Sequence, residues 1–250
     1  SNQTQIWHGI ITDIRACNVL SGHHDYQLTL SPTLWLLSLD KVSRVFQHRT
    51  VIDIVTQIFD EFGLSDYDSS QLQGQYDPID YCVQYHESTF HFISRLLAKY
   101  GVYYYFTYSQ SKHTLILCDN KSTYVSTSPA TLRCDELKPS DLQSWFYTTI
   151  PQSYEIHAID YNPSLPTEPF AAQASYVAQT IPDSEMLPIY LYPCGAQTTS
   201  QAQYLATIHA DRLACEQVRA QARSSLLGLA PGQRFELTHQ NKLDQNGAYL

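Results

Sequence analysis

Long hydrophobic stretches and basic residues are both scarce in this chain of 250 residues. No run approaches the ~18 consecutive apolar residues of a membrane-spanning helix, and residues 1–10 have neither the charged start nor the apolar centre of a secretory signal. Lys and Arg number 15 against 24 Asp and Glu, which gives a formal net charge of −9. Because nucleic acids and anionic membranes both attract basic surfaces, we expect no nucleic-acid partner and no stable membrane anchor.

Glycine is also rare, with nine residues, and none of them forms the G-x-G-x-x-G or G-x-x-x-x-G-K loops that cradle phosphate groups. The sequence contains no G-x-S-x-G elbow and no S-x-x-K accompanied by K-T-G, so common signatures of a serine nucleophile are missing. We therefore expect no catalytic residue, no cofactor and no metal site in this chain. This favours binding or structure over catalysis.

Histidine offers two possible metal-binding patterns, and both are weak. His23, His24 and Asp25 are adjacent in an expected turn, where neighbouring side chains point in different directions, so we interpret them as solvated. His86 and His91 are five positions apart across an expected strand–helix junction. That spacing is neither the i, i+4 pair of a zinc-binding helix nor a zinc-finger spacing.

Cysteine and carboxylate pairs give equally weak signals. Six Cys without a C-x-x-C pair exclude zinc-ribbon and thioredoxin motifs, and they predict free, mostly buried thiols in a reducing compartment. Cys82 and His86 lie ~13 Å apart along a strand, too far for a catalytic pair, so Cys82 is expected in the core. We considered two carboxylate pairs as acid–base candidates, Glu155 with Asp160 and Glu87 with Asp80. Because any acidic chain contains many such pairs, they are negligible evidence for catalysis.

Tyrosine, by contrast, is abundant, with 19 residues, while charged residues make up only 16% against a typical ~25%. The centres of protein interfaces are rich in Tyr and poor in charge, which suggests a surface that partners cover. An aromatic run near residue 104 could stack on sugars or bases, but Lys99 is the only basic residue beside it. We favour core packing plus a subunit contact for Tyr100, Tyr103, Tyr104, Tyr105, Phe106 and Tyr108.

Residues 51–62 have the strongest helical pattern. Thr50 and Asp53 match a capping box, and Gly63 occupies the position of a C-terminal glycine. The apolar side chains of this helix recur at helical spacing on one face: Val51, Ile54, Val55, Ile58, Phe59 and Phe62.

Two further helices are expected. The segment 89–100 begins after Ser88 or Thr89 and ends at Gly101, with an apolar face of Phe90, Ile93, Leu96, Leu97 and Tyr100. The longest helix is expected over 200–225, with a charged stripe formed by Arg212, Glu216, Arg219 and Arg223.

The remaining segments favour strands and loops. A β-branched run with an internal glycine predicts a bulged strand over 6–14, and alternation predicts strands over 26–30 and 81–85. Residues 34–37 are an apolar run too short to classify. We further expect a polar loop over 65–78 and a hairpin of 102–106 and 114–118. Short strands among Pro-containing loops are expected over 120–195, with an extended crossover at 162–169. The last strands are expected at 233–237 and 249–250.

The order of the motifs is more specific than any one of them. They are WHGIITDI at 7–14, YQLTLSPTLWLLSL at 26–39, SRVFQHRTVIDIVTQIF at 43–59, YCVQYHESTFHFISRLLAKYGVYYYF at 81–106, HTLILCD at 113–119, LAPGQRFEL at 229–237 and NGAYL at 246–250. This series resembles the VgrG family, the spike proteins of type VI secretion systems, in the region similar to the baseplate hub of contractile phage tails. The resemblance is strong over 7–119 and 229–250 and weaker over 120–228.

The resemblance implies an α+β, β-rich fold of phage-tail-hub-like β-barrel domains with intervening helices. It divides the chain into the remainder of a first hub barrel (1–40), an α+β hub domain (41–120) and a second barrel region with the long helix and return strands (121–250). It also implies a homotrimeric ring that joins the Hcp tube to a membrane-puncturing needle and contacts baseplate proteins. A PAAR protein or an effector would attach through a region after residue 250. The resemblance further implies that the protein assembles in the bacterial cytoplasm and is then translocated into a target cell.

Some features of the family are missing from this sequence. The family has a long stretch before the Trp7 motif and a needle after the hub, so we expect the chain to be a piece of a longer protein. The acidic run that usually precedes the family's G-[IV]-Y-Y is Ala98-Lys99-Tyr100 here. Two alternatives stay open: a phage or phage-like tail baseplate hub, and a tail-associated cell-wall hydrolase, whose mark would be a cleft that holds two carboxylates.

Overall fold

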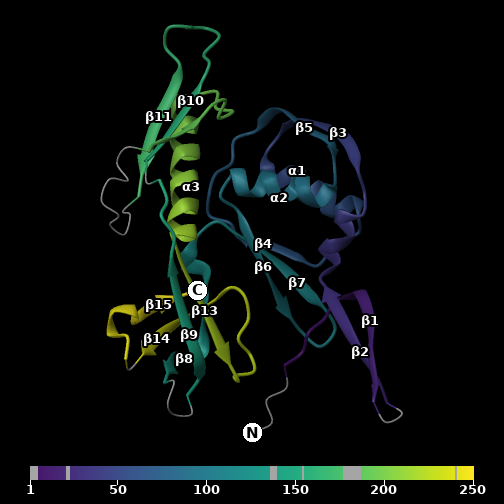
Figure 1. Ribbon diagram of the computed structural model, residues 1–250. Coiled ribbons are helices and arrows are strands. Elements are labelled where there is room, and N and C mark those ends of the chain that lie inside the picture. The colour runs from purple at the N-terminus through teal and green to yellow at the C-terminus, as the bar shows by residue number, and fades with distance from the viewer. Residues whose placement is uncertain (1–4, 21–22, 136–139, 154, 177–186, 240) are drawn as a thin grey trace. The chain divides into compact units, whose positions relative to one another are not determined.

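The computed structural model describes all residues except 1–4, 21–22, 136–139, 154, 177–186 and 240 (Figure 1). The described chain is rich in strands and divides into two compact units, one of residues 1–128, 227–234 and 250, the other of residues 129–226 and 235–249. This strand-rich α+β architecture confirms the expected fold class. Within the described ranges, no helix combines the length and the hydropathy needed to cross a bilayer.

Two helices form the centre of the first unit. Helix α1, Val51–Glu61, begins at Thr50, where both halves of the predicted capping box are present, and it ends before Gly63, whose φ of 67° requires the freedom of glycine. Helix α2, Thr89–Lys99, has Ser88 as its N-cap, because the Ser88 hydroxyl accepts from the backbone N–H of His91.

Two small sheets surround these helices. Strands β3 (Val42–Arg49) and β5 (Ile79–Glu87) pair antiparallel, and β4 (Tyr67–Gln71), β7 (His113–Cys118) and β6 (Tyr103–Tyr108) form a second sheet in the order β4-β7-β6. The predicted hairpin is therefore β6–β7, whereas β4 lies inside the expected polar loop 65–78. The core consists of side chains from both helices, from β3, β5 and β7, and from residues 34–37. The most buried of them include Leu37, Ile54, Ile58, Phe59, Phe92, Ile93, Leu97 and Leu117.

The chain enters this unit through a long antiparallel hairpin, β1 (Ile10–Leu20) and β2 (His23–Ser31), followed by a 3-10 helix, η1 (Thr33–Ser38). The strand expected over 6–14 thus begins four residues later, at Ile10. The glycine before it is needed for a close contact, since a Cβ at Gly9 would lie 2.7 Å from the carbonyl oxygen of Ser31. The unclassified apolar run 34–37 is part of η1, with Leu34 and Leu37 buried.

The second unit is built on two sheets and one helix. A five-stranded sheet has the order β13-β9-β8-β14-β15, and a three-stranded sheet, β11-β10-β12, packs against helix α3 (Figure 1). The bounds of these elements are β8 Val125–Cys134, β9 Leu142–Thr149, β10 Glu155–Asp160, β11 Phe170–Ser175, β12 Ile189–Leu191, α3 Thr199–Gln217, β13 Val218–Ser224, β14 Gln233–His239 and β15 Gly247–Tyr249. Short 3-10 helices, η2 (Lys121–Thr123) and η4 (Leu243–Gln245), complete the described chain.

Two expectations for this unit are wrong. The helix expected over 200–225 ends at Gln217, because Val218–Ser224 pairs antiparallel with β9, so the charged stripe from Arg212 to Arg223 does not form on one helix. The segment 162–169 is not a crossover, because it joins β10 to β11, which are antiparallel neighbours from Glu155↔Ser175 to Asp160↔Phe170.

Candidate interaction surfaces

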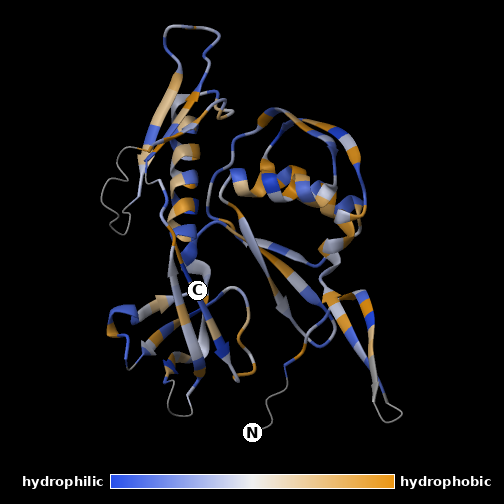
Figure 2. Ribbon diagram, in the orientation of Figure 1, coloured by the Kyte–Doolittle hydropathy of each residue, from blue (hydrophilic) through white to orange (hydrophobic). Residues whose placement is uncertain are grey.

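The β1–β2 hairpin has one apolar face that remains open to water. The cross-strand pairs Ile11↔Leu30, Ile14↔Leu28 and Ala16↔Tyr26 place their side chains on this face, and a register shift between Ile11 and Asp13 keeps Ile14 in line with Ile11. The five large side chains are 48–60% exposed, and Figure 2 shows the apolar residues alternating along both strands. We call Ile11, Ile14, Tyr26, Leu28 and Leu30 the hairpin face.

The opposite side of the same hairpin is polar. Arg15 Nε lies 2.8 Å from Asp13 Oδ2, and the pairs Asp13↔Thr29 and Arg15↔Gln27 present hydrophilic side chains. A two-stranded ribbon is marginally stable by itself, and its strand edges can pair with another chain. An amphipathic ribbon of this kind is suited to contact with another protein surface rather than to chemistry.

The β3–β5 sheet has a second open face. Its inner side buries Phe46 and Cys82 against the helices, whereas Val45, Tyr81 and Tyr85 on the outer side are 52%, 59% and 79% exposed. These exposed tyrosines agree with the expectation of an interface rich in Tyr.

A hydrogen-bonded polar network fixes this sheet to both helices. Arg44 donates from Nε to Gln84 Oε1 at 3.0 Å, from Nη1 to Glu61 Oε2 at 2.7 Å and from Nη2 to Thr89 Oγ1 at 2.8 Å. The buried Thr89 hydroxyl in turn donates to Asp40 Oδ2 at 2.5 Å. The buried polar side chains of this network, Gln84 and Thr89, are therefore hydrogen-bonded within the protein, as stability requires.

Glu87 and Asp119 perform similar structural roles. The guanidinium of Arg95 donates to both carboxylate oxygens of Glu87 and thereby lowers the pKa of Glu87. Burial would raise the pKa of Asp119, but the backbone N–H groups of Gln73 and Gly74 and the hydroxyl of Tyr76 outweigh it and lower the pKa. Both carboxylates are thus kept ionised as anchors.

The two carboxylate pairs that were considered as acid–base candidates and set aside are not brought together. Glu87 and Asp80 lie seven positions apart on β5, a separation of ~20 Å along a strand. Glu155 contacts His157 at the start of β10, whereas Asp160 at its end accepts from the backbone N–H groups of Gly195 and Ala196. A cleft that holds two carboxylates is therefore not formed by either pair.

The histidines considered as metal ligands lie at separate places in the structure. His91 Nδ1 lies 2.7 Å from Glu87 Oε2, and His86 is exposed on the bulged end of β5. The expected turn at His23–Asp25 is wrong, because β2 begins at His23 and pairs with β1; His24 and Asp25 are exposed on β2, and the His23 side chain lies outside the described residues. No group of three or more metal-ligating side chains comes together in the described ranges.

The six cysteines are not joined in disulfides, and three of them are buried: Cys82, Cys118 and Cys134. Cys82 belongs to the core, as predicted, and burial raises its pKa. Cys17 and Cys215 are exposed, and Cys194 is intermediate, so the thiols are less buried than expected.

The aromatic strand β6 divides its side chains between two faces. Tyr104 and Phe106 pack against the core of the first unit. Tyr103 instead stacks on Tyr124 with ring centroids 5.5 Å apart, and Tyr105 lies tilted to the same ring at 6.5 Å. The expected alternation is therefore confirmed, and the run does not form one continuous stacking platform.

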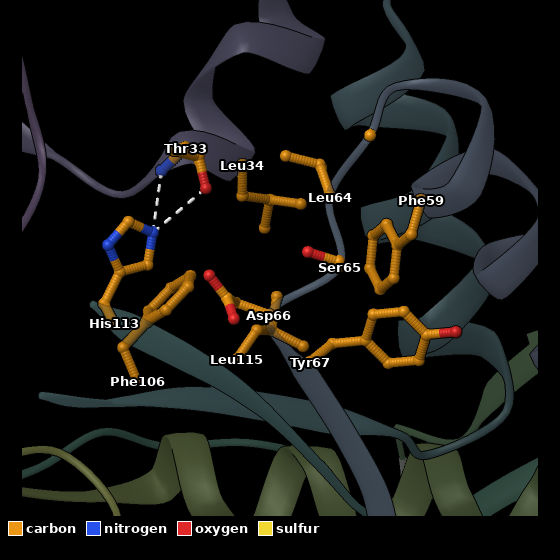
Figure 3. Close-up of a pocket in the computed structure, with 11 residues that line it drawn as sticks. Thr33, Leu34, Phe59, Leu64, Ser65, Asp66, Tyr67, Phe106, His113 and Leu115 are labelled. Carbon is orange, nitrogen blue, oxygen red and sulfur yellow. Dashed lines mark hydrogen bonds between the residues drawn. The ribbon is translucent and has the colours of Figure 1, made fainter. Parts of the chain in front are cut away.

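A small cavity of about 110 Å³ lies where the α1–β4 connection meets β7 (Figure 3). Small-molecule sites typically occupy about 300–1,000 Å³. His113 and Asp66 supply polar groups to its lining, with Leu34, Phe59 and Leu115 among the apolar side chains. His113 Nε2 lies 3.0 Å from both the backbone nitrogen and the hydroxyl of Thr33. The cavity is too small for an ordinary substrate.

Open apolar faces on two sheets of the first unit are thus the surfaces best suited to contact with another protein. Residues 1–250 match the family model described as phage tail baseplate hub (GPD), and the chain belongs to this family.

Curated relatives are spike proteins. The chain is 31% identical over 255 residues to "Type VI secretion system spike protein VgrG1b" and 29% identical over 252 residues to VgrG1c, both of Pseudomonas aeruginosa. These matches include 98% of this chain but only 33% and 34% of the relatives, so the chain spans about a third of their length.

Solved structures show the same fold. An E. coli protein described as a type VI secretion component similar to T4 tail proteins gp27 and gp5 matches with a TM-score of 0.63 and 18% identity, over 93% of this chain and 50% of that one. A tail protein from Neisseria meningitidis matches with a TM-score of 0.65 and 11% identity, over 97% and 72% of the two chains.

Proposed function

We propose that this chain is the hub region of a type VI secretion spike and that its role is mechanical. The observation that carries the proposal is the match to spike proteins over 98% of the chain. The exposed hairpin face and the tyrosines of β5 support it, because a hub needs broad surfaces for neighbouring subunits.

The assembly that we propose is a homotrimer. Three hub regions form a ring that receives the Hcp tube on one side and continues into the needle on the other, with baseplate proteins around it. A PAAR protein or an effector attaches beyond the hub. In this proposal the spike assembles in the bacterial cytoplasm and is then translocated. Residues 1–40, 41–120 and 121–250 serve as first-barrel remainder, α+β hub domain and second barrel region.

We also propose that this region is not an enzyme. Another relative is named "Actin cross-linking toxin VgrG1" of Vibrio cholerae, but the match includes only 11% of that protein. Glu87, Asp119 and Asp160 are engaged in structural hydrogen bonds. The purified chain should therefore give no clearing on a peptidoglycan zymogram; clearing abolished by a single carboxylate substitution would support the cell-wall hydrolase instead.

The test of the function is a secretion assay in the bacterium that carries the gene. Deletion should abolish release of the tube protein into the medium, and the complete gene should restore it. Unchanged release after deletion, together with co-purification of the protein with phage-like particles, would favour the alternative, a phage tail baseplate hub.

A further inference from the structure

Strand β13 is the first strand of the five-stranded sheet of the second unit and pairs with β9 along one edge (Figure 1). Among the described residues, no strand pairs with its other edge. Ala222 is exposed although it lies opposite the buried Trp145 of β9, so the sheet is open at this edge. Such an edge presents a row of backbone N–H and C=O groups with which another strand can pair.

The outward side of β13 is basic. Arg219, Gln221 and Arg223 alternate along the strand, and all three are exposed. The two arginines are four residues apart, which separates their backbone positions by ~13 Å along a strand. Gln221 lies opposite Phe146 of β9, whose side chain is 64% exposed. Arginine and aromatic side chains are the types that protein interfaces favour.

The two arginines of β13 have no ion pair with any acidic side chain of the described residues. The chain nevertheless has 24 Asp and Glu against 15 Lys and Arg, so carboxylates are abundant. Arg44, Arg95 and Arg133 each lie within ion-pair distance of one. The positive charges of β13 are therefore not compensated by the part of the chain that the structure describes.

Charge complementarity indicates what can pair with this edge. Two β13 strands from two copies would bring arginines together, and like charges on neighbouring strands are unfavourable. An extended segment with carboxylates four residues apart would place one beside each arginine, because paired strands rise by nearly the same distance per residue. The net charge of −9 repels an acidic segment from the rest of the chain.

We propose that β13 is a docking edge for an extended acidic segment of a partner protein. The segment adds to the sheet as a further strand, with one carboxylate on Arg219 and another on Arg223. Backbone hydrogen bonds supply affinity, and the two ion pairs select the sequence and fix its register. This edge belongs to the second unit, whereas the hairpin face belongs to the first, so the proposal goes beyond the proposed function and does not depend on it.

A synthetic peptide tests this edge on the 250-residue chain. In the labelled nine-residue probe, Val alternates with Thr or Glu, and its two Glu are four positions apart. Fluorescence anisotropy at low salt should show saturable binding, with an affinity about tenfold lower when both Glu are replaced by Gln. A third peptide, N-methylated at three consecutive central residues, cannot pair as a strand along either edge and should not bind. The ¹⁵N amide signals of Val218–Ser224 should shift on binding of the first peptide.

Variants locate the binding site. Replacing both arginines, Arg219→Gln with Arg223→Gln, should lower the affinity about tenfold, because two exposed ion pairs are lost. Arg49→Gln, which removes an exposed arginine of β3 in the first unit, should change the affinity less than about twofold. Both replaced side chains of β13 are exposed, so thermal unfolding of the double variant should match that of the natural chain.

Three results would overturn the proposal: no binding of the glutamate peptide, equal binding by the natural chain and the double variant, or undiminished binding of the N-methylated peptide. Self-association of the chain that the double variant abolishes would identify a second copy as the occupant of the edge, and it would overturn the proposal as well.

Discussion

Arg95 Nη2 lies 2.6 Å from Glu87 Oε1, and Arg95 Nε lies 2.9 and 3.0 Å from the two carboxylate oxygens of Glu87. Glu87 is the last residue of β5, and Arg95 is in the second turn of α2. The pair therefore ties the strand to the helix that follows it. Because the Glu87 side chain is only 14% exposed, this pair is less screened by water than the surface pairs of the chain.

We expect Glu87→Gln to lower the free energy of unfolding at neutral pH by about 1–3 kcal/mol, the range for hydrogen bonds to charged groups. Asp13→Asn, which breaks the more exposed Asp13–Arg15 pair, is the matched control and should cost at most about 1 kcal/mol. Urea unfolding followed by circular dichroism measures both. Equal losses in the two variants would contradict the structural role of Glu87.

The same pair predicts a dependence on pH. The Arg95 hydrogen bonds lower the pKa of Glu87 below its ordinary value of 4.5, so its stabilising contribution is present above that value and is lost as the pH falls through the lowered pKa. The stability difference between the natural chain and Glu87→Gln should therefore shrink with acidification. A difference that stays constant down to about pH 3 would show that Glu87 acts through packing instead.

Core packing of α2 gives a second prediction. Leu97 is 2% exposed and lies in the core, so Leu97→Ala should destabilise the chain by about 2–5 kcal/mol. Lys99→Ala, on the exposed side of the same helix, should change stability by about 0.5 kcal/mol or less. A loss below about 0.5 kcal/mol for Leu97→Ala would place this residue outside the core.

The ends of α1 could be predicted because their signals are local. Thr50 and Asp53 contact each other within one turn at the start of the helix. After its end, the chain needs a φ of 67° at position 63, and the sequence has glycine there. The buried face of α2 could be predicted only in part. Phe92 was not expected in it, yet it is fully buried and stacks on Phe46 with centroids 5.7 Å apart. The helix is covered on more than one side, and periodicity does not reveal how wide its buried face is.

The wrong end of the long helix in the second unit has a tertiary cause. Val218–Ser224 contains good helix formers, but each of its residues pairs across to β9, and this pairing overrides the local preference. The hairpin face was also missed. The alternation of residues 26–30 predicted a half-buried strand, whereas Tyr26, Leu28 and Leu30 are exposed, and the register shift near Thr12 hides their partners on β1. Sequence periodicity shows that a face is apolar, but it does not identify what covers the face.

The hairpin face gives a prediction for assembly. In the full-length protein, Leu28→Lys should weaken self-association, because it places a charge in the apolar face, while Gln27→Lys on the polar side should leave association unchanged. Leu28 is 48% exposed, so the substitution should change monomer stability by about 0.5 kcal/mol or less. Sedimentation velocity and thermal unfolding measure the two effects. Equal association of both variants would remove this face from the interface.

The last prediction concerns how much the hub contacts and the needle contacts each stabilise the proposed trimer. In the proposed spike, intertwined needle strands bury area that side-by-side hub contacts do not replace. Hub contacts of standard interface size fit a Tyr-rich surface with little charge, yet affinity does not follow from area. We therefore expect the 250-residue chain to be a monomer or a weak oligomer at micromolar concentration, and the full-length protein to be a stable trimer. Light scattering on both at matched concentrations is the measurement. A 250-residue chain that stays trimeric on dilution to nanomolar concentration would show that hub contacts suffice, and the proposed division between hub and needle would be wrong.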